Sequence, residues 1–229
     1  MKSTSIALLA LLGLLVPVAL AAQVQNENLA NAVLAARRKN AALLQTYNWN
    51  CRTEILENDK MQDIRIDLVS VGPEGQLQRS MINDQPGKLP RGFLRRAIAQ
   101  GQQQQAEKTV KELGALVDQY TLPSGGKVIA FLVQAQVQPV TTSEGTTVLQ
   151  VTGHDVVVPG DMFTLTLNGK TLLPESVQVS TTYDGDAVTV TGSFITLPSG
   201  LNILQYATAV IPSKNITVMM HNYDCVGNN

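Results

Sequence analysis

Few side chains in this sequence could bind a metal or act as a catalytic base. There are only two histidines: His154 lies beside Asp155, and His221 lies near Asp224. Together with one of these carboxylates or Asp161, two histidines would make a known metal-ligand set. The H-E-x-x-H spacing of a helical zinc site is absent. The pattern therefore favours ordinary polar positions and no metal, and a metal-dependent enzyme is only our third hypothesis.

The motifs of nucleophilic and nucleotide chemistry are also absent from the sequence. Ser193 follows Gly192, but it lies inside a predicted strand and not in the G-x-S-x-G turn of a hydrolase. Neither a G-x-G-x-x-G loop nor a Walker loop occurs. Asp184 and Asp186 flank a glycine at a predicted hairpin tip, which offers too few oxygen ligands for calcium. We therefore expect no catalytic residues and no cofactor.

Residues 1–22 have the pattern of a secretory signal peptide. Lys2 supplies a positive charge, residues 6–16 form an apolar run, and Pro17 precedes the small residues 19–22. An apolar core of this length before an A-x-A-like site is typical of a cleaved leader and is short for a membrane span. No cysteine follows the core, so lipidation there is not expected. The leader predicts a soluble periplasmic or secreted protein.

Cys51 and Cys225 are the only cysteines of the chain. In an exported protein an even number of cysteines is typical of disulfides. A disulfide between Cys51 and Cys225 would join the start of the domain to its last strand. Closing so long a loop can stabilise a fold by up to about 5 kcal/mol. Two free buried thiols are the alternative.

The composition excludes electrostatic recognition of nucleic acid or of an anionic membrane surface. Lys and Arg number 17 and Asp and Glu number 18, and charged residues make up only 15% of the chain. Apart from the leader, no apolar run is long enough to cross a bilayer. The polar residues are largely Gln, Asn, Thr and Ser, a composition common in exported β-rich proteins.

Helical periodicity occurs in two places. Residues 26–46 place apolar side chains at near-helical spacing. A helical insert at about 92–135 contains a second apolar face over 93–120. Residues 123–133 predict a further short helix, although their β-branched content leaves a strand possible.

The first predicted strand begins at Tyr47, where the period changes from helical to alternating. Tyr47, Trp49 and Cys51 alternate with polar residues, so they share one face. Arg52 and Glu54 share the opposite face and predict a surface ion pair. Trp49 is then either a core aromatic residue or part of the lip of a ligand cavity.

The remaining sequence predicts an antiparallel meander. Two strands follow the first before the helical insert, and six more lie at 146–152, 161–168, 173–182, 187–196, 202–211 and 215–223, separated by turn residues. Apolar residues alternate with Thr, Ser and Gln, so one face is buried. We expect an α+β fold: a curled antiparallel sheet of about nine strands, or incomplete β-barrel, covering two or three helices. Residues 23–229 are expected to form this single half-barrel domain.

The arrangement resembles the periplasmic lipoprotein-carrier (outer-membrane lipoprotein-sorting) superfamily of exported bacterial proteins. The residues that carry the resemblance are Tyr47-Asn48-Trp49, Arg52-Thr53-Glu54, Pro73-Glu74-Gly75, Pro159-Gly160-Asp161 and Tyr183-Asp184-Gly185 with the strand at 187–196. The resemblance implies an apolar cavity between a half-barrel and its helices, in which family members hold acyl chains. It maps no functional residue of the family onto this sequence.

The leading functional hypothesis is a binding or carrier protein for an apolar ligand, with lipid or lipoprotein as its partner. A curled sheet whose helices do not fill it leaves an apolar cavity. Alternation alone selects the candidate cavity residues Tyr47, Trp49, Phe163, Leu165, Phe194, Tyr206 and Met220. The second hypothesis is a structural or protein-interaction module of the cell envelope with a packed core and no ligand.

Overall fold

The computed structural model describes residues 26–73, 75–85, 103–121 and 125–228. The predicted leader at 1–22 and part of the predicted helical insert lie outside these residues. Within the described part of the chain, no helix is long and apolar enough to cross a membrane.

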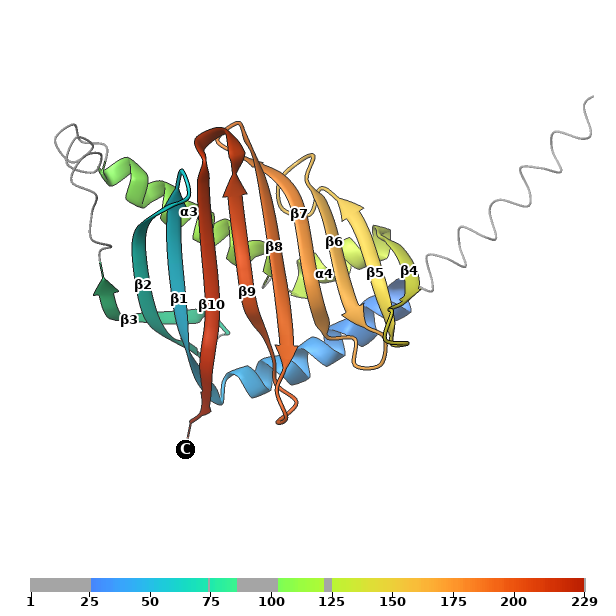
Figure 1. Ribbon diagram of the computed structural model, residues 1–229. Helices are drawn as coiled ribbons and strands as arrows, with labels where there is room; N and C mark the ends of the chain where they lie inside the picture. The colour runs from blue at the N-terminus through green and yellow to red at the C-terminus, as the bar shows by residue number, and fades with distance from the viewer. Residues whose placement is uncertain (1–25, 74, 86–102, 122–124, 229) are drawn as a thin grey trace, which may run out of the picture.

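Ten antiparallel strands form one open sheet, which confirms the α+β fold class with one strand more than the nine expected (Figure 1). They are β1 (Tyr47–Glu57), β2 (Lys60–Val71), β3 (Leu77–Gln85), β4 (Gln136–Thr141), β5 (Thr147–His154), β6 (Met162–Asn168), β7 (Pro174–Tyr183), β8 (Asp186–Thr196), β9 (Asn202–Ile211) and β10 (Ile216–Gly227). Their order is β3-β2-β1-β10-β9-β8-β7-β6-β5-β4. Two meanders are therefore joined where the first strand pairs with the last, from Tyr47 opposite Gly227 to Glu57 opposite Ile216.

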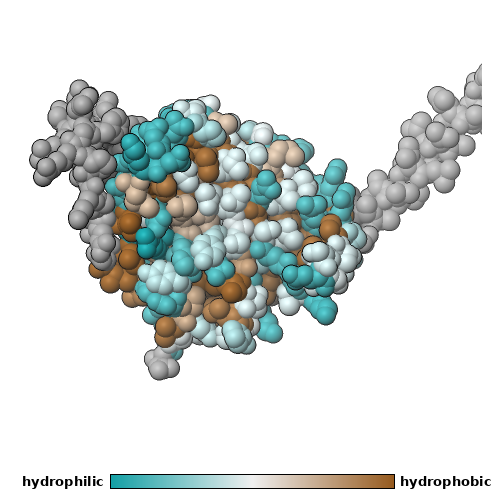
Figure 2. Space-filling view, viewed as in Figure 1, coloured by the Kyte–Doolittle hydropathy of each residue, from teal (hydrophilic) through white to brown (hydrophobic). Residues whose placement is uncertain are grey.

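Side chains alternate across the sheet as the sequence predicts. On β7, Val177 and Val179 are buried while Gln178 and Ser180 are exposed. The same period places Val188 on the inner face of β8. The outer face, which Figure 2 views directly, mixes hydrophilic and hydrophobic residues and has no helix over it in this view. The apolar core therefore lies on the inner face of a one-sided sheet.

The described helices all lie on that inner face. They are a helix over residues 26–44, α3 (Gln103–Thr121) and α4 (Gly125–Gln134), all behind the sheet in Figure 1. The helix over 26–44 is held near both ends by asparagine side chains. Asn26 Nδ2 donates to the carbonyl oxygen of Ala135 at 3.1 Å, and Asn40 exchanges two 2.8 Å hydrogen bonds with the backbone of Asn202.

The tenth strand is β4, which the sequence pattern does not reveal. Five of its six residues are exposed and only Val137 is half-buried, so it lacks apolar alternation. It also contains Pro139, which cannot donate a backbone hydrogen bond and is tolerated on an edge strand. β4 forms one edge of the sheet and pairs only with β5.

Gly192 allows α3 to approach the sheet closely. A Cβ atom there would lie 2.8 Å from Val177 Cγ1, 3.1 Å from Leu204 Cδ1 and 3.5 Å from Thr121 Cγ2. Thr121 is the last residue of α3, whereas Val177 and Leu204 belong to the flanking strands. The absence of a side chain at Gly192 thus sets the distance between helix and sheet.

We predict that Gly192→Ala lowers the free energy of unfolding by about 1–3 kcal/mol, because the added methyl group overlaps fixed neighbours. Gly114→Ala is the matched control, because nothing lies within 4 Å of a Cβ at this position in the interior of α3. It should stabilise the protein by about 0.5–1 kcal/mol. Urea denaturation measures both changes, and equal effects of the two substitutions would contradict the close approach.

Candidate functional site

A cavity of about 840 Å³ lies between the helices and the inner face of the sheet. Its wall includes residues from three helices, namely the helix over 26–44, α3 and α4. Eight strands also contribute, namely β1, β2, β3, β6, β7, β8, β9 and β10. Its volume lies within the range of about 300–1,000 Å³ that is usual for small-molecule sites. The helices therefore cover the sheet without filling the space above it.

The floor of the cavity is apolar and rich in aromatic residues. Trp49, Phe131 and Phe163 lie in its wall and are at most 9% exposed. The rings of Phe131 and Phe163 meet edge to face with centroids 4.9 Å apart, a favourable geometry for aromatic pairs. Leu204 and Met220 extend the floor toward the strands at the centre of the sheet. Such a surface favours contact with hydrocarbon over contact with water.

The structure places five of the seven predicted cavity residues in this wall: Trp49, Phe163, Leu165, Phe194 and Met220. Their role in binding stays a prediction.

The other two predicted cavity residues lie elsewhere. Tyr206 is on the outer face, 48% exposed, and its ring stacks on His221 with centroids 4.3 Å apart. A β-bulge explains the error: Ser193 pairs with Tyr206 but Phe194 pairs with Leu204, so one extra residue of β9 reverses the alternation. Tyr47 begins β1 opposite Gly227, at the end of the sheet and outside the cavity wall.

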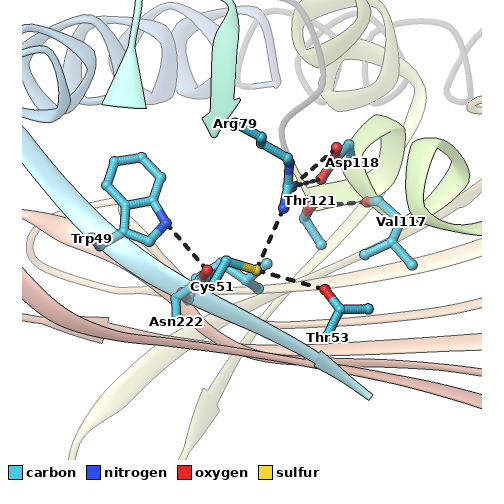
Figure 3. A network of polar contacts seen from close by, with 9 residues as sticks. Trp49, Cys51, Thr53, Arg79, Val117, Asp118, Thr121 and Asn222 are labelled. Carbon is cyan, nitrogen blue, oxygen red and sulfur yellow. Dashed lines mark hydrogen bonds and ion pairs between the residues drawn. The ribbon is translucent and has the colours of Figure 1, made fainter. Parts of the chain in front are cut away.

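Trp49 is fixed in the cavity wall by a side-chain amide. Its Nε1 donates to Asn222 Oδ1 at 3.1 Å (Figure 3). Asn222 Nδ2 in turn donates to the carbonyl oxygen of Leu204 at 2.8 Å. Asn222 is itself part of the wall. The indole therefore presents carbon to the cavity while its polar N–H group is satisfied. Trp49 is thus a core aromatic residue, and a role for it at a ligand site stays a prediction.

A guanidinium bridges α3 and the sheet at one side of the cavity. Arg79 Nη2 donates to both carboxylate oxygens of Asp118, at 3.2 and 3.3 Å, and Nη1 donates to Cys51 Sγ at 3.4 Å (Figure 3). Burial raises the pKa of Asp118, although the positive charge of Arg79 opposes this. No sequence signal identifies this bridge, because it depends on how α3 packs over β3.

A buried carboxylate organises the loop between β5 and β6. Asp161, 1% exposed, accepts backbone N–H groups at 2.8 Å from Val156, 2.8 Å from Val157 and 3.0 Å from Val158. It also accepts the hydroxyl of Tyr120 on α3 at 2.7 Å. Burial opposes ionisation, but these donors together hold the pKa of Asp161 below its usual value. Because Val156 and Tyr120 line the cavity, this carboxylate positions two parts of its wall.

The predicted disulfide between Cys51 and Cys225 is wrong, since both thiols are free. The strand register explains the error: Cys51 lies opposite Asn222 on β10, three residues before Cys225. A disulfide requires the two Cα atoms to lie within about 7 Å and the Cβ atoms to face each other. Burial raises the pKa of the Cys51 thiol, which is hydrogen-bonded to Arg79.

The two histidines do not meet. His154 is on β5 and His221 on β10, so β6 to β9 separate them and they lie five strand spacings, or roughly 24 Å, apart along the sheet. His154 Nδ1 contacts Asp155 Oδ2 at 2.5 Å on the surface. Among the described residues, no group of three or more His, Cys, Asp and Glu side chains is placed to hold a metal ion. His154 and His221 are therefore too far apart to bind the same metal ion.

The predicted ion pair between Arg52 and Glu54 is confirmed, with 2.5 Å between Arg52 Nη2 and Glu54 Oε1. Arg52 lies opposite His221 and Glu54 opposite Met219 on β10. The pair is on the outer face and takes no part in the cavity.

No protein-family model matches this chain, and no curated protein sequence matches it significantly. Three solved structures are similar in fold. One is a LolA superfamily protein from Nitrosomonas europaea, with 11% identity, a TM-score of 0.39, and coverage of 87% of this chain and 94% of that chain. Another is a DUF1329 family protein from Desulfovibrio piger, with 9% identity, a TM-score of 0.41, and coverage of 89% and 92%. The third is a domain assigned to an outer membrane lipoprotein-sorting protein of Vibrio parahaemolyticus, with 8% identity, a TM-score of 0.36, and coverage of 86% and 93%.

Identities of 8–11% and TM-scores of 0.36–0.41 transfer neither a ligand nor a residue role to this chain. The functional evidence is the cavity itself.

We predict that Asp161→Asn lowers the free energy of unfolding by about 1–3 kcal/mol at pH 7, because a charged acceptor of four hydrogen bonds is lost. The pKa of Asp161 is lower in the folded state than in the unfolded state, where it is about 3.9. The contribution of its charge is therefore fully present well above pH 4 and is lost as the pH falls below that value. Denaturation at a series of pH values measures the difference between the two proteins. A difference that grows on acidification would contradict this account.

A second prediction concerns the free thiols. Cys225→Ser should change the free energy of unfolding by no more than about 0.5 kcal/mol, even in protein purified without reductant. Both cysteines of the unfolded wild-type protein should react with an alkylating agent, as counted by mass spectrometry. A loss of about 2–5 kcal/mol together with unreactive cysteines would show that a disulfide forms after all.

Proposed function

We propose that this chain is a binding or carrier protein for an apolar ligand, a lipid or the acyl chains of an acylated protein. The observation that carries the proposal is the cavity of about 840 Å³ between the helices and the one-sided sheet. Its floor consists of buried aromatic and aliphatic side chains, so a hydrocarbon chain is the ligand part that it suits.

The volume agrees with a long hydrocarbon ligand. A methylene group is about the size of a water molecule, whose share of liquid volume is about 30 Å³. The cavity of about 840 Å³ therefore has room for roughly 28 methylene groups. This number exceeds the number of carbon atoms in one acyl chain of ordinary length and approaches the number in two such chains.

The second hypothesis, a ligand-free structural module, predicts a filled interior, because protein cores pack at the density of organic crystals. A cavity of this size with an apolar floor favours the binding role over that hypothesis. The proposal assigns no catalytic step to the cavity residues. Arg79 and Asp118, which are ionisable residues of the wall, form an ion pair with each other.

We also infer that the protein acts outside the cytoplasm, in the periplasm or after secretion, as one domain over residues 23–229. This part of the proposal rests on the sequence pattern of residues 1–22. Lipids and acylated proteins need a soluble carrier where they cross an aqueous compartment, and an exported domain with an apolar cavity suits that need.

Trp49 offers a direct test, because it is the only tryptophan of the chain and lies in the cavity wall. Dodecanoate or the neutral dodecanol, added below its aggregation concentration, should change the Trp49 emission in a saturable way. Leu165→Phe, which narrows the cavity from β6, should weaken the response several-fold. Fluorescence titration measures both affinities.

Thr164→Phe is the matched control, because Thr164 lies next to Leu165 on the opposite face of β6, paired with the exposed Gln178. It should leave the titration unchanged. An unsaturable response, or equal weakening by both substitutions, would contradict binding in the cavity.

A further inference from the structure

The loop between β6 and β7 contributes two consecutive leucines to the cavity wall. Leu172 and Leu173 both line the cavity, and both are half-buried. Asn202 connects this loop to the covering helix that contains Asn40. Its Nδ2 donates to the carbonyl oxygen of the first residue of β7 at 3.1 Å, and its backbone is hydrogen-bonded to Asn40. The two leucines therefore lie near the contact between the sheet and that helix.

Leu172 has a backbone conformation that leucine rarely adopts. Its φ is 57°, in the left-handed region, where the Cβ atom comes too close to a backbone carbonyl oxygen. Among the described residues, six others that are not glycine have a positive φ, and all six are asparagine or aspartate. Their short polar side chains tolerate this region far better than leucine does. Glycine or asparagine would therefore fit the position of Leu172 with less strain.

Hydrogen bonds to Asn168 hold Leu172 in this conformation. The N–H group of Leu172 donates to the carbonyl oxygen of Asn168 at 2.9 Å, and the N–H group of Asn168 donates to the carbonyl oxygen of Leu173 at 2.9 Å. The side-chain oxygen of Asn168 accepts the backbone N–H groups of Lys170 and Thr171, both at 3.0 Å. A strained conformation persists where surrounding contacts impose it in this way.

The left-handed residue allows two neighbouring side chains to reach the same wall. In an extended chain, successive side chains point to opposite faces, so only one of two consecutive leucines would line the cavity. At Leu172 the chain is not extended, this alternation is interrupted, and both leucines belong to the wall. The strained backbone thus adds apolar surface to the cavity. Strained residues are concentrated at ligand-binding sites for this kind of reason.

We propose that Leu172 contacts the hydrocarbon part of the ligand and is a determinant of ligand affinity. This inference rests on the proposed function and names a residue of that same site. Leu172 packs against the core but stays half-buried, so a ligand in the cavity can cover more of its side chain. That additional burial stabilises the complex and offsets the strain of the backbone. Alternation could not select Leu172, because it lies in a turn.

The substitution Leu172→Gly removes the side chain and the backbone strain together. Glycine adopts a positive φ without steric cost, so the melting temperature of the unliganded protein should not fall by more than about 2 °C. The dissociation constant for dodecanol, measured by the Trp49 titration, should rise about tenfold, because an apolar contact made in the complex is lost.

Two further variants separate the apolar contact from the geometry of the turn. Leu172→Asn tolerates the left-handed region but has a polar side chain, so its affinity for dodecanol should fall as in the glycine variant. Leu172→Met keeps an apolar side chain of similar volume and should bind dodecanol within about threefold of the wild type.

The substitution Asp184→Gly is the matched control. Asp184 also has a positive φ, 53°, but it lies in the turn between β7 and β8 and is not part of the cavity wall. Glycine at this position changes a left-handed turn without changing the cavity. The affinity for dodecanol should therefore equal that of the wild type.

Undiminished affinity of Leu172→Gly for dodecanol would overturn the contact between Leu172 and the ligand. A larger fall in its melting temperature would show that the leucine is kept to stabilise the fold, and equal weakening by Asp184→Gly would assign the effect to the turns in general. Either result would also overturn the inference. Failure of the wild type to bind dodecanol would instead overturn the proposed function, so the two failures are distinguishable.

Discussion

A sheet with one apolar face must cover that face, and the way this protein does so determines the rest of its structure. The inner face spans ten strands, whereas the described helices cover it without filling the space above it. Water would meet the aromatic and aliphatic floor unless another apolar group occupied it. The cavity is thus a consequence of a wide curled sheet combined with a small number of helices.

Polar contacts at the helix ends keep this space open. Asn26 and Asn40 hold the helix over 26–44 near its two ends, while Val33, Leu34 and Arg37 between them line the cavity. Tyr120 holds the end of α3 through its hydrogen bond to Asp161. Hydrogen bonds fix a separation that apolar packing alone does not specify, since apolar contact is non-directional. The helices are therefore positioned as a cover over the sheet.

Local pattern predicts most of the strands but not all of them. Alternation and turn residues predicted the strands from β5 to β10 to within a few residues, because each has one buried face. β4 was missed because an edge strand buries almost nothing, and Tyr206 was misplaced because a bulge reverses the alternation along β9. The prediction of a disulfide was wrong for a related reason. Whether two cysteines can pair depends on the strand register, which the spacing of the cysteines in the sequence does not reveal. The Arg79 contacts and the Asp161 loop depend on how helices far away in sequence pack on the sheet, and no local pattern encodes them.

Native mass spectrometry of the full-length gene product, purified in its soluble form without detergent, would show whether the cavity holds an apolar ligand. The account predicts a population heavier than the polypeptide by the mass of a lipid, which collisional activation releases and an organic extract identifies. A single population at the polypeptide mass, with no lipid in the extract and no uptake of added lipid, would contradict it.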